Sequence, residues 1–169
     1  MSLSLVILLL VSLQRLGELL LARRNTLRLL AAGAREEGAG HYPLIVLLHG
    51  AWLAGLWFLA WKHKVSLPWL GVFVVLQVLR VWIIATLGER WTTRIIVPRA
   101  AQRIRKGPYR FLAHPNYVVV AAEIAVLPLV FGLALYAAVF SVLNAAILWF
   151  RIRAESRALG LHSETGGTG

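Results

Sequence analysis

The 169-residue sequence contains no cysteine, only 7 acidic residues and a charged share of 15%, against roughly one quarter in typical soluble domains. Without cysteine, the chain cannot be a secreted scaffold held together by disulfides. Apolar residues make up 59% of the chain and its mean hydropathy is +0.73, which excludes intrinsic disorder. The 18 Lys and Arg residues nevertheless give a net charge of +11. This combination predicts an integral membrane protein that keeps its positive charges on surface loops.

Four apolar tracts are long enough to form membrane spans, namely residues 3–21, 43–61, 68–87 and 118–150. A helix needs about 20 residues to cross about 30 Å of hydrocarbon, so each of the first three tracts predicts one crossing. The last tract would reach roughly 50 Å as a single helix, which exceeds the bilayer. Pro128 and Gly132 lie near its middle and predict a tight hairpin of two helices.

The fold predicted from these tracts is an all-α membrane protein with five transmembrane helices, over residues 3–21, 43–61, 68–87, 116–132 and 133–151. Residues 1–162 are predicted to form a single domain, and residues 163–169 a disordered tail. Residues 1–5 carry no positive charge and no small-residue cleavage site follows the first tract. We therefore expect this tract to be retained as a helix.

The basic residues predict the orientation of the spans. With five spans, the loops after the first and third spans and the C-terminal segment share one side. They carry four, seven and three Lys or Arg residues, against two in the loop after the second span. The positive-inside rule then predicts that the protein spans the cell membrane with its N-terminus outside and its C-terminus in the cytoplasm. A four-span topology would separate the basic tail from the other basic loops.

Topology and contact with anionic membrane lipids account for the basic charge, so we expect no nucleic-acid partner. Within the long basic loop, residues 91–106 mix apolar and arginine positions. They predict an amphipathic stretch along the cytoplasmic interface, broken at Pro98. The sequence leaves the oligomeric state open.

Polar side chains occur inside the predicted spans, where they are costly and are by default functional candidates. Four of them, each on a different span, lie roughly 7–12 Å below the cytoplasmic boundary at 1.5 Å per residue. This shared depth predicts a polar chamber that opens to the cytoplasm. The structural alternative is helix–helix pairing, of Arg15 with Glu18 and of Arg80 with Glu123. The polar residues in the spans are Gln14, Arg15, Glu18, Gln77, Arg80, Glu123 and Asn144.

Other common site signatures are missing. His49, in the second span, is predicted to be a hydrogen-bonded packing residue. The histidines and glutamates show no metal-ligand spacing such as HExxH, so we expect no metal site. The chain also lacks a Gly-rich strand–helix fingerprint, so a soluble Rossmann-type cofactor site is not expected.

The most informative segment is GPYRFLAHPNY, residues 107–117, where the long basic loop enters the fourth span. Part of it has a structural use, because Gly107-Pro108 is a turn signal and Pro115 suits the first position of a helix. A second segment, RIRAESRAL over residues 151–159, leaves the fifth span on the same side. The hairpin should bring both segments together above the layer of Glu123 and Asn144. The side chains expected to converge there are Tyr109, His114, Tyr117, Arg151 and Glu155.

These two segments resemble the isoprenylcysteine carboxyl methyltransferase superfamily, membrane enzymes that use S-adenosylmethionine and that also include phospholipid methyltransferases. The resemblance covers residues 99–159. The N-terminal half, with Glu18, Arg24-Asn25, Glu37 and His41-Tyr42, is similar to a bacterial branch that includes alkylpyrone O-methyltransferases. The superfamily often has two successive glutamates where this chain has Glu155-Ser156.

The resemblance implies a set of site residues. Glu155 would bind the amino or ribose groups of S-adenosylmethionine, and Arg151 would lie beside the methyl acceptor. Residues implied to line the cofactor site are Gly107, Pro108, Tyr109, His114, Pro115 and Tyr117. Those predicted to form the polar chamber or substrate site are Arg15, Glu18, Arg80 and Asn144, and the catalytic candidates are Arg151, Glu123 and His114.

Methyl transfer from a sulfonium depends on positioning and on exclusion of water. A carboxylate acceptor needs only a cation such as Arg151 to orient it, whereas a hydroxyl acceptor benefits from a base, for which His114 or Glu123 is a candidate. A lipophilic acceptor would enter from the bilayer between helices. A prenylated-cysteine carboxylate, an alkylpyrone hydroxyl and a phospholipid amine all suit such a site.

Two other functions remain open at this point. Some membrane sterol reductases carry an HPNY-like motif and use NADPH, although they are usually longer. A transporter or scaffold without enzymatic activity is the other alternative, and the absence of a repeated half argues against a transporter.

Overall fold

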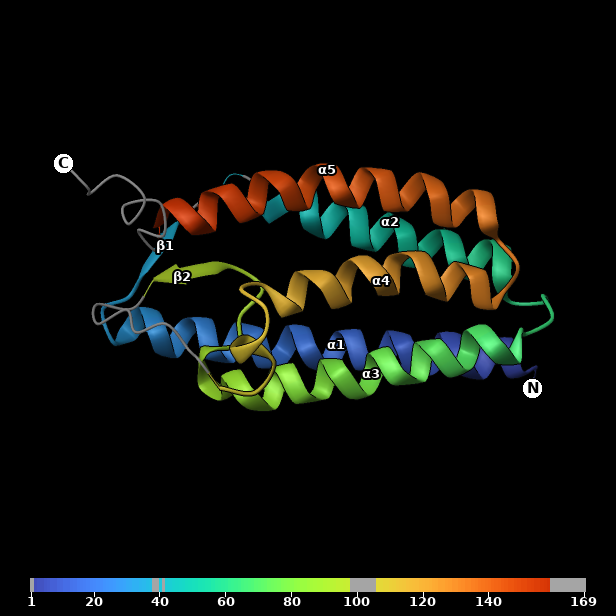
Figure 1. Ribbon diagram of the computed structural model, residues 1–169, viewed down its shortest axis with the longest axis horizontal. Coiled ribbons are helices and arrows are strands. Elements are labelled where there is room, and N and C mark those ends of the chain that lie inside the picture. The colour runs from blue at the N-terminus through green and yellow to red at the C-terminus, as the bar shows by residue number, and fades with distance from the viewer. Residues whose placement is uncertain (1, 38–39, 41, 98–105, 159–169) are drawn as a thin grey trace.

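The computed structural model describes residues 2–37, 40, 42–97 and 106–158, and the side chains up to residue 153. In this part of the chain there are five α-helices, two short strands and two 3-10 turns (Figure 1). The helices are α1 (Leu3–Ala31), α2 (Tyr42–Ala60), α3 (Leu67–Leu87), α4 (Pro115–Val130) and α5 (Ala134–Ala158). The strands are β1 (Arg35–Glu37) and β2 (Ile95–Val97), and the turns are η2 (Gly88–Arg90) and η3 (Gly107–Arg110).

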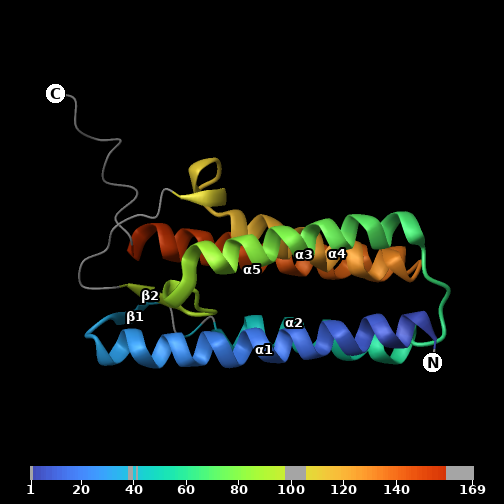
Figure 2. The ribbon, with the colours of Figure 1, turned by 90° about the horizontal axis from the view of Figure 1, so that it is seen from below.

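The five helices run along the long axis of the molecule and alternate in direction (Figure 1). Helices α1 and α2 form one layer, and α3, α4 and α5 form the other (Figure 2). The start of α1, the α2–α3 loop and the α4–α5 turn lie at one end. The two strands, η3, the start of α4 and the end of α5 lie at the opposite end, which we call the sheet end.

Four of the described helical segments are long and apolar enough to cross a membrane: Leu3–Ala31, Tyr42–Ala60, Leu67–Arg90 and Ala134–Arg153. The remaining helix, Pro115–Val130, is apolar but has only 16 residues. The membrane character of the fold is therefore confirmed, while the number of crossings and their orientation stay predictions. Many large apolar side chains face outward, such as Leu13, Val78 and Leu135 at 64%, 64% and 80% exposure. Acyl chains would cover such a surface in a membrane.

The all-α prediction was wrong in one respect, because the described residues include a two-stranded antiparallel sheet. Arg35 pairs with Val97 and Glu37 with Ile95. The first helix also continues to Ala31, well past the predicted end of the span, and stops before Gly33, which has a φ of +85°. The β-branched run at 95–97 favours extended backbone. Residues 95–97 thus form a strand instead of the predicted interfacial stretch, whose residues 98–105 lie outside the described part of the chain.

The predicted hairpin between the last two helices is confirmed. Helix α4 ends at Val130, Gly132 takes a left-handed φ of +73°, and α5 begins at Ala134. The backbone N–H of Gly132 donates to the carbonyl of Leu129 at 3.0 Å, which closes the turn. A residue with a Cβ is disfavoured at this φ, so glycine permits the tight reversal.

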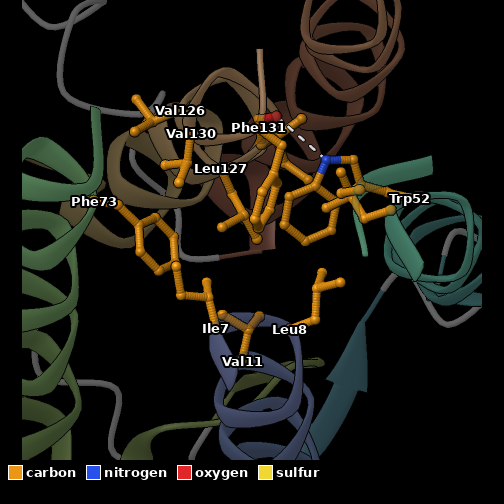
Figure 3. Close-up of a cluster of buried hydrophobic side chains, with 12 residues drawn as sticks. Ile7, Leu8, Val11, Trp52, Phe73, Val126, Leu127, Val130 and Phe131 are labelled. Atoms are coloured by element: carbon orange, nitrogen blue, oxygen red, sulfur yellow. Dashed lines mark hydrogen bonds between the residues drawn. The ribbon is translucent and has the colours of Figure 1, made fainter. Parts of the chain in front are cut away.

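Apolar side chains from both layers fill the end of the bundle away from the sheet (Figure 3). Ile7 and Leu8 of α1 meet Leu127 and Phe131 at the α4–α5 end, and all four are buried. The indole Nε1 of Trp52 donates to a carbonyl of α4 at 3.3 Å, drawn as the dashed line in Figure 3. This core closes one end of the bundle, and the buried charged residues Glu18, Arg80 and Glu123 lie outside it.

Candidate active site

A buried ion-pair network joins three helices in the middle of the bundle. Arg80 of α3 donates from Nε and Nη2 to the two carboxylate oxygens of Glu18 on α1, at 2.6 Å each. Its Nη1 donates to Glu123 of α4 at 2.9 Å. All three residues are buried. Paired charges with satisfied hydrogen bonds are the form in which ionised groups persist in a low-dielectric interior.

Arg15 of α1 completes the network. It donates to Glu18 at 2.9 Å and forms an ion pair with Glu123, also at 2.9 Å. Gln77 donates to the free oxygen of Glu123 at 2.9 Å and accepts a hydrogen bond from Gln14 at 2.8 Å. Both predicted pairs, Arg15 with Glu18 and Arg80 with Glu123, are therefore present. Two arginines and two glutamates leave this group with no formal net charge.

A cavity of about 270 Å³ borders this network, and we call it the deep cavity. Its polar wall comes from all five helices and from the segment that follows η2, and its apolar wall comes from α1, α2, α4 and α5. The polar and aromatic residues that line it are Arg15, Glu18, Tyr42, His49, Trp52, Arg80, Trp91, Thr92, Thr93, Asn116, Tyr117, Glu123, Asn144 and Arg151. The residues predicted to form a polar chamber all line this cavity, namely Arg15, Glu18, Arg80 and Asn144, and its role as a substrate site stays a prediction.

A second cavity of about 150 Å³ lies at the sheet end, and we call it the mouth cavity. Basic and aromatic side chains make up a larger share of its lining than of the lining of the deep cavity. Five residues border both cavities, namely Trp91, Thr92, Asn116, Tyr117 and Arg151. The remaining polar residues of the mouth cavity are Arg90, Arg94, Tyr109 and His114.

Arg151 stands where the two cavities adjoin. Its Nε donates to the hydroxyl of Tyr117 at 2.9 Å, and its Nη2 donates to the carbonyl of Thr93. The ring of Tyr117 stacks on that of His114, with centroids 5.5 Å apart. These contacts join the end of α5 to the start of α4 and to the segment before β2. The predicted convergence of residues 107–117 with residues 151–159 is observed for His114, Tyr117 and Arg151.

The segment that carries Trp91 is held in place by α1. The side-chain amide of Asn25 donates to the carbonyls of Gly88 and Trp91, at 3.1 and 2.8 Å. This anchor explains why a polar residue is buried near the end of the first helix. It also holds the backbone at Trp91, whose side chain borders both cavities.

The buried side-chain nitrogen and oxygen atoms without a hydrogen-bond partner among the described residues gather at one place. They are Nε1 of Trp91, Oδ1 of Asn116, and both Nδ2 and Oδ1 of Asn144. All three residues line the deep cavity. Native proteins rarely leave buried polar atoms unpaired, so this grouping indicates a site for a polar ligand.

The sequence-predicted cofactor residues divide into two groups. Tyr109, His114 and Tyr117 line the mouth cavity. Gly107, Pro108 and Pro115 do not; they shape the backbone around it. Gly107 has a φ of +54° and a Cβ there would meet Thr86 of α3, while Pro115 begins α4 as predicted. The side chain of Glu155 lies outside the described part of the chain.

Several lining residues were not predicted, among them Trp91, Asn116 and His49. Asn116 stands inside the HPNY motif, so its position was a usable signal. His49 has the predicted hydrogen bond, from Nδ1 to the carbonyl of Ile45 at 2.8 Å, yet it also borders the deep cavity. In the described residues there is no cluster of three potential metal ligands.

Comparisons with known proteins place these residues in a wider context. The sequence model of the isoprenylcysteine carboxyl methyltransferase family matches residues 69–161, which include α4, α5 and both motifs. A Bacillus subtilis (strain 168) protein, described as uncharacterized protein YpbQ, is 37% identical over 155 residues, covering 89% of this chain and 92% of its own. No solved structure matches the chain. The narrower similarity to alkylpyrone O-methyltransferases stays a prediction.

Proposed function

Because the chain belongs to the isoprenylcysteine carboxyl methyltransferase family, whose members are S-adenosylmethionine-dependent, we propose that it is a membrane O-methyltransferase acting on a lipophilic acceptor. The reaction would take place at the cytoplasmic face of the cell membrane, and the acceptor would present a carboxylate or a hydroxyl. S-adenosylmethionine would supply an electrophilic methyl group. The observation that carries the proposal is the pair of adjoining cavities, one at the sheet end and one inside the bundle, with Arg151 between them.

The mouth cavity has the chemistry that this cofactor requires. Arg90 and Arg94 border it, and a guanidinium can bind the carboxylate of the methionyl group; Arg94 also pairs with Glu36 at 2.9 Å. Tyr109, His114 and Tyr117 offer ring faces suited to an adenine. The unpaired Nε1 of Trp91 and Oδ1 of Asn116 provide one further donor and one further acceptor. Glu155, which the family resemblance assigns to the amino or ribose groups, follows one helical turn after Arg151.

The deep cavity suits an acceptor with a polar head and an apolar tail. Leu53, Val120 and Ile124 are among its apolar wall residues, while the ion-pair network forms part of its polar wall. A tail would reach it from the bilayer between helices, whose outward faces are apolar. Enclosure by apolar walls keeps water away from the reacting groups, which favours a displacement at a sulfonium.

The contacts also suggest a different role for each of the three catalytic candidates. Arg151 stands beside both cavities, so we assign it to orienting the acceptor oxygen. Both carboxylate oxygens of Glu123 already accept hydrogen bonds or ion pairs, from Gln77, Arg80 and Arg15. We therefore assign Glu123 to holding the network, and His114, at the mouth cavity, remains the candidate base for a hydroxyl acceptor.

Cofactor binding to the purified full-length chain in detergent tests the proposal. S-adenosylmethionine or its demethylated product, S-adenosylhomocysteine, should raise the melting temperature, and NADPH should not. His114→Ala and Glu155→Ala should weaken binding of the sulfur cofactors. Arg153→Ala is the matched control, because Arg153 is exposed and lies over the ring of Trp149, away from both cavities. Stabilisation by NADPH with no response to either sulfur cofactor would favour a lipid reductase instead.

A further inference from the structure

Asn144 of α5 is 1% exposed, and neither its Nδ2 nor its Oδ1 has a hydrogen-bond partner among the described residues. It borders the deep cavity but not the mouth cavity. Trp91 and Asn116, the other residues with unpaired polar atoms, border both. Asn144 is therefore the unpaired group that belongs to the deep cavity alone.

The charged residues of the cavity wall do not explain why an amide is buried at position 144. The carboxylates of Glu18 and Glu123 form ion pairs with the guanidinium groups of Arg15 and Arg80. These four charged groups therefore pair with one another. The network is formally neutral and leaves the amide of Asn144 out. A buried amide without a hydrogen-bond partner costs stability in the empty protein, because its donor and acceptor have left water without compensation.

Resting on the proposed function, we propose that Asn144 is a specificity-determining residue that binds the polar head of the methyl acceptor in the deep cavity. Its amide offers a donor and an acceptor side by side. It therefore selects a head group that can both donate and accept a hydrogen bond, such as a hydroxyl on a lipophilic molecule. Arg151 lies on the same helix two turns later and borders the same cavity, so one helix face presents both groups.

This role predicts opposite effects on stability and on binding. Asn144→Leu replaces the amide by an apolar group of similar size, so the empty protein should melt at a higher temperature than the wild type. The matched control is Asn25→Leu. Asn25 is also a buried asparagine, but its amide donates to two carbonyls, so the same substitution there should lower the melting temperature.

Binding is tested with the full-length chain in lipid nanodiscs, without cofactor, and with two probes of equal chain length, 4-octylphenol and octylbenzene. The wild type should bind the phenol about three- to tenfold more tightly, the value of one neutral hydrogen bond. Asn144→Leu should bind both probes alike. Asn144→Ser, which keeps a smaller donor and acceptor, should retain part of the preference.

Two results would overturn the role of Asn144: a lower melting temperature for Asn144→Leu in the empty protein, or an unchanged preference for the phenol in that variant. Binding of S-adenosylhomocysteine to the same samples separates this inference from the proposed function. If the wild type binds it but Asn144→Leu still prefers the phenol, only the inference fails. If the wild type does not bind it, the proposed function fails whatever the probes show.

Discussion

The guanidinium of Arg80 on α3 binds the carboxylate of Glu18 on α1 through two parallel hydrogen bonds of 2.6 Å. This two-point geometry is the strongest form of an arginine–carboxylate contact. It joins the layer of α1 and α2 to the layer of α3, α4 and α5 (Figure 2). The pair also borders the deep cavity, so the group that holds the layers together is part of the wall of the candidate site.

Removing Arg80 should destabilise the fold strongly. In Arg80→Met, Glu18 and Glu123 would share Arg15 alone, and a buried charge without its partner costs roughly 3–5 kcal/mol. Unfolding in detergent measures this loss. The double variant Glu18→Gln with Arg80→Met keeps the network neutral and should be more stable than Arg80→Met. Arg28→Met is the control, because its exposed pair with Glu89 at 3.2 Å is worth at most about 1 kcal/mol. Equal losses for Arg80→Met and Arg28→Met would contradict the role given to the network.

Tyr117→Phe should weaken cofactor binding and also lower the melting temperature, because the hydroxyl that it removes holds Arg151. The substitution removes the hydroxyl that accepts from Arg151, and the ring that stacks on His114 remains. A hydrogen bond to a charged group is worth about 1.5–3 kcal/mol, so the affinity for S-adenosylhomocysteine should fall about tenfold. Calorimetry in detergent gives the affinity.

Tyr136→Phe is the matched control for this change. The Tyr136 hydroxyl donates to the carbonyl of Trp52 at 2.9 Å, near the other end of the bundle. Its loss should lower the melting temperature without changing cofactor affinity. If Tyr136→Phe lowered the cofactor affinity as much as Tyr117→Phe does, the loss of affinity in Tyr117→Phe could not be assigned to Arg151.

Gly107→Ala should displace η3 and weaken cofactor binding. The added Cβ would meet the side chain of Thr86, and alanine is disfavoured at a φ of +54°. Gly71→Ala has open space around the new methyl group and lies inside α3, so it should leave binding intact and hold or raise stability. The two variants are compared by the melting-temperature shift that S-adenosylhomocysteine produces. Equal shifts would contradict the placement of the cofactor beside η3.

Much of the helical framework was predictable from the sequence, because apolar tract length and turn residues act locally. Pro128 and Gly132 indicated the hairpin, and Arg15 with Glu18 is an i, i+3 pair on one helix. The contacts between Arg80 and Glu18 were not predictable in the same way. They depend on which faces of α1 and α3 meet, and hydropathy does not encode that when a helix is apolar on nearly every side.

The sheet and the Trp91 segment were missed for a related reason. Arg35 and Glu37 carry no strand periodicity of their own and become a strand by pairing with residues 95–97. Asn25 anchors the backbone at Gly88 and Trp91, more than sixty residues away in sequence. Sequence spacing cannot reveal a contact of this kind, so the unpaired indole of Trp91 was visible only in the folded chain.

Transfer of a labelled methyl group tests the account most directly. Membranes containing the full-length chain are incubated with S-adenosylmethionine labelled in its methyl group, and the lipids are then extracted into organic solvent. Labelled lipophilic product is expected with the wild type and with Arg153→Ala, and little or none with His114→Ala or Arg151→Ala. Absence of label in the wild-type extract, with lipid-dependent oxidation of NADPH in its place, would contradict the proposed function.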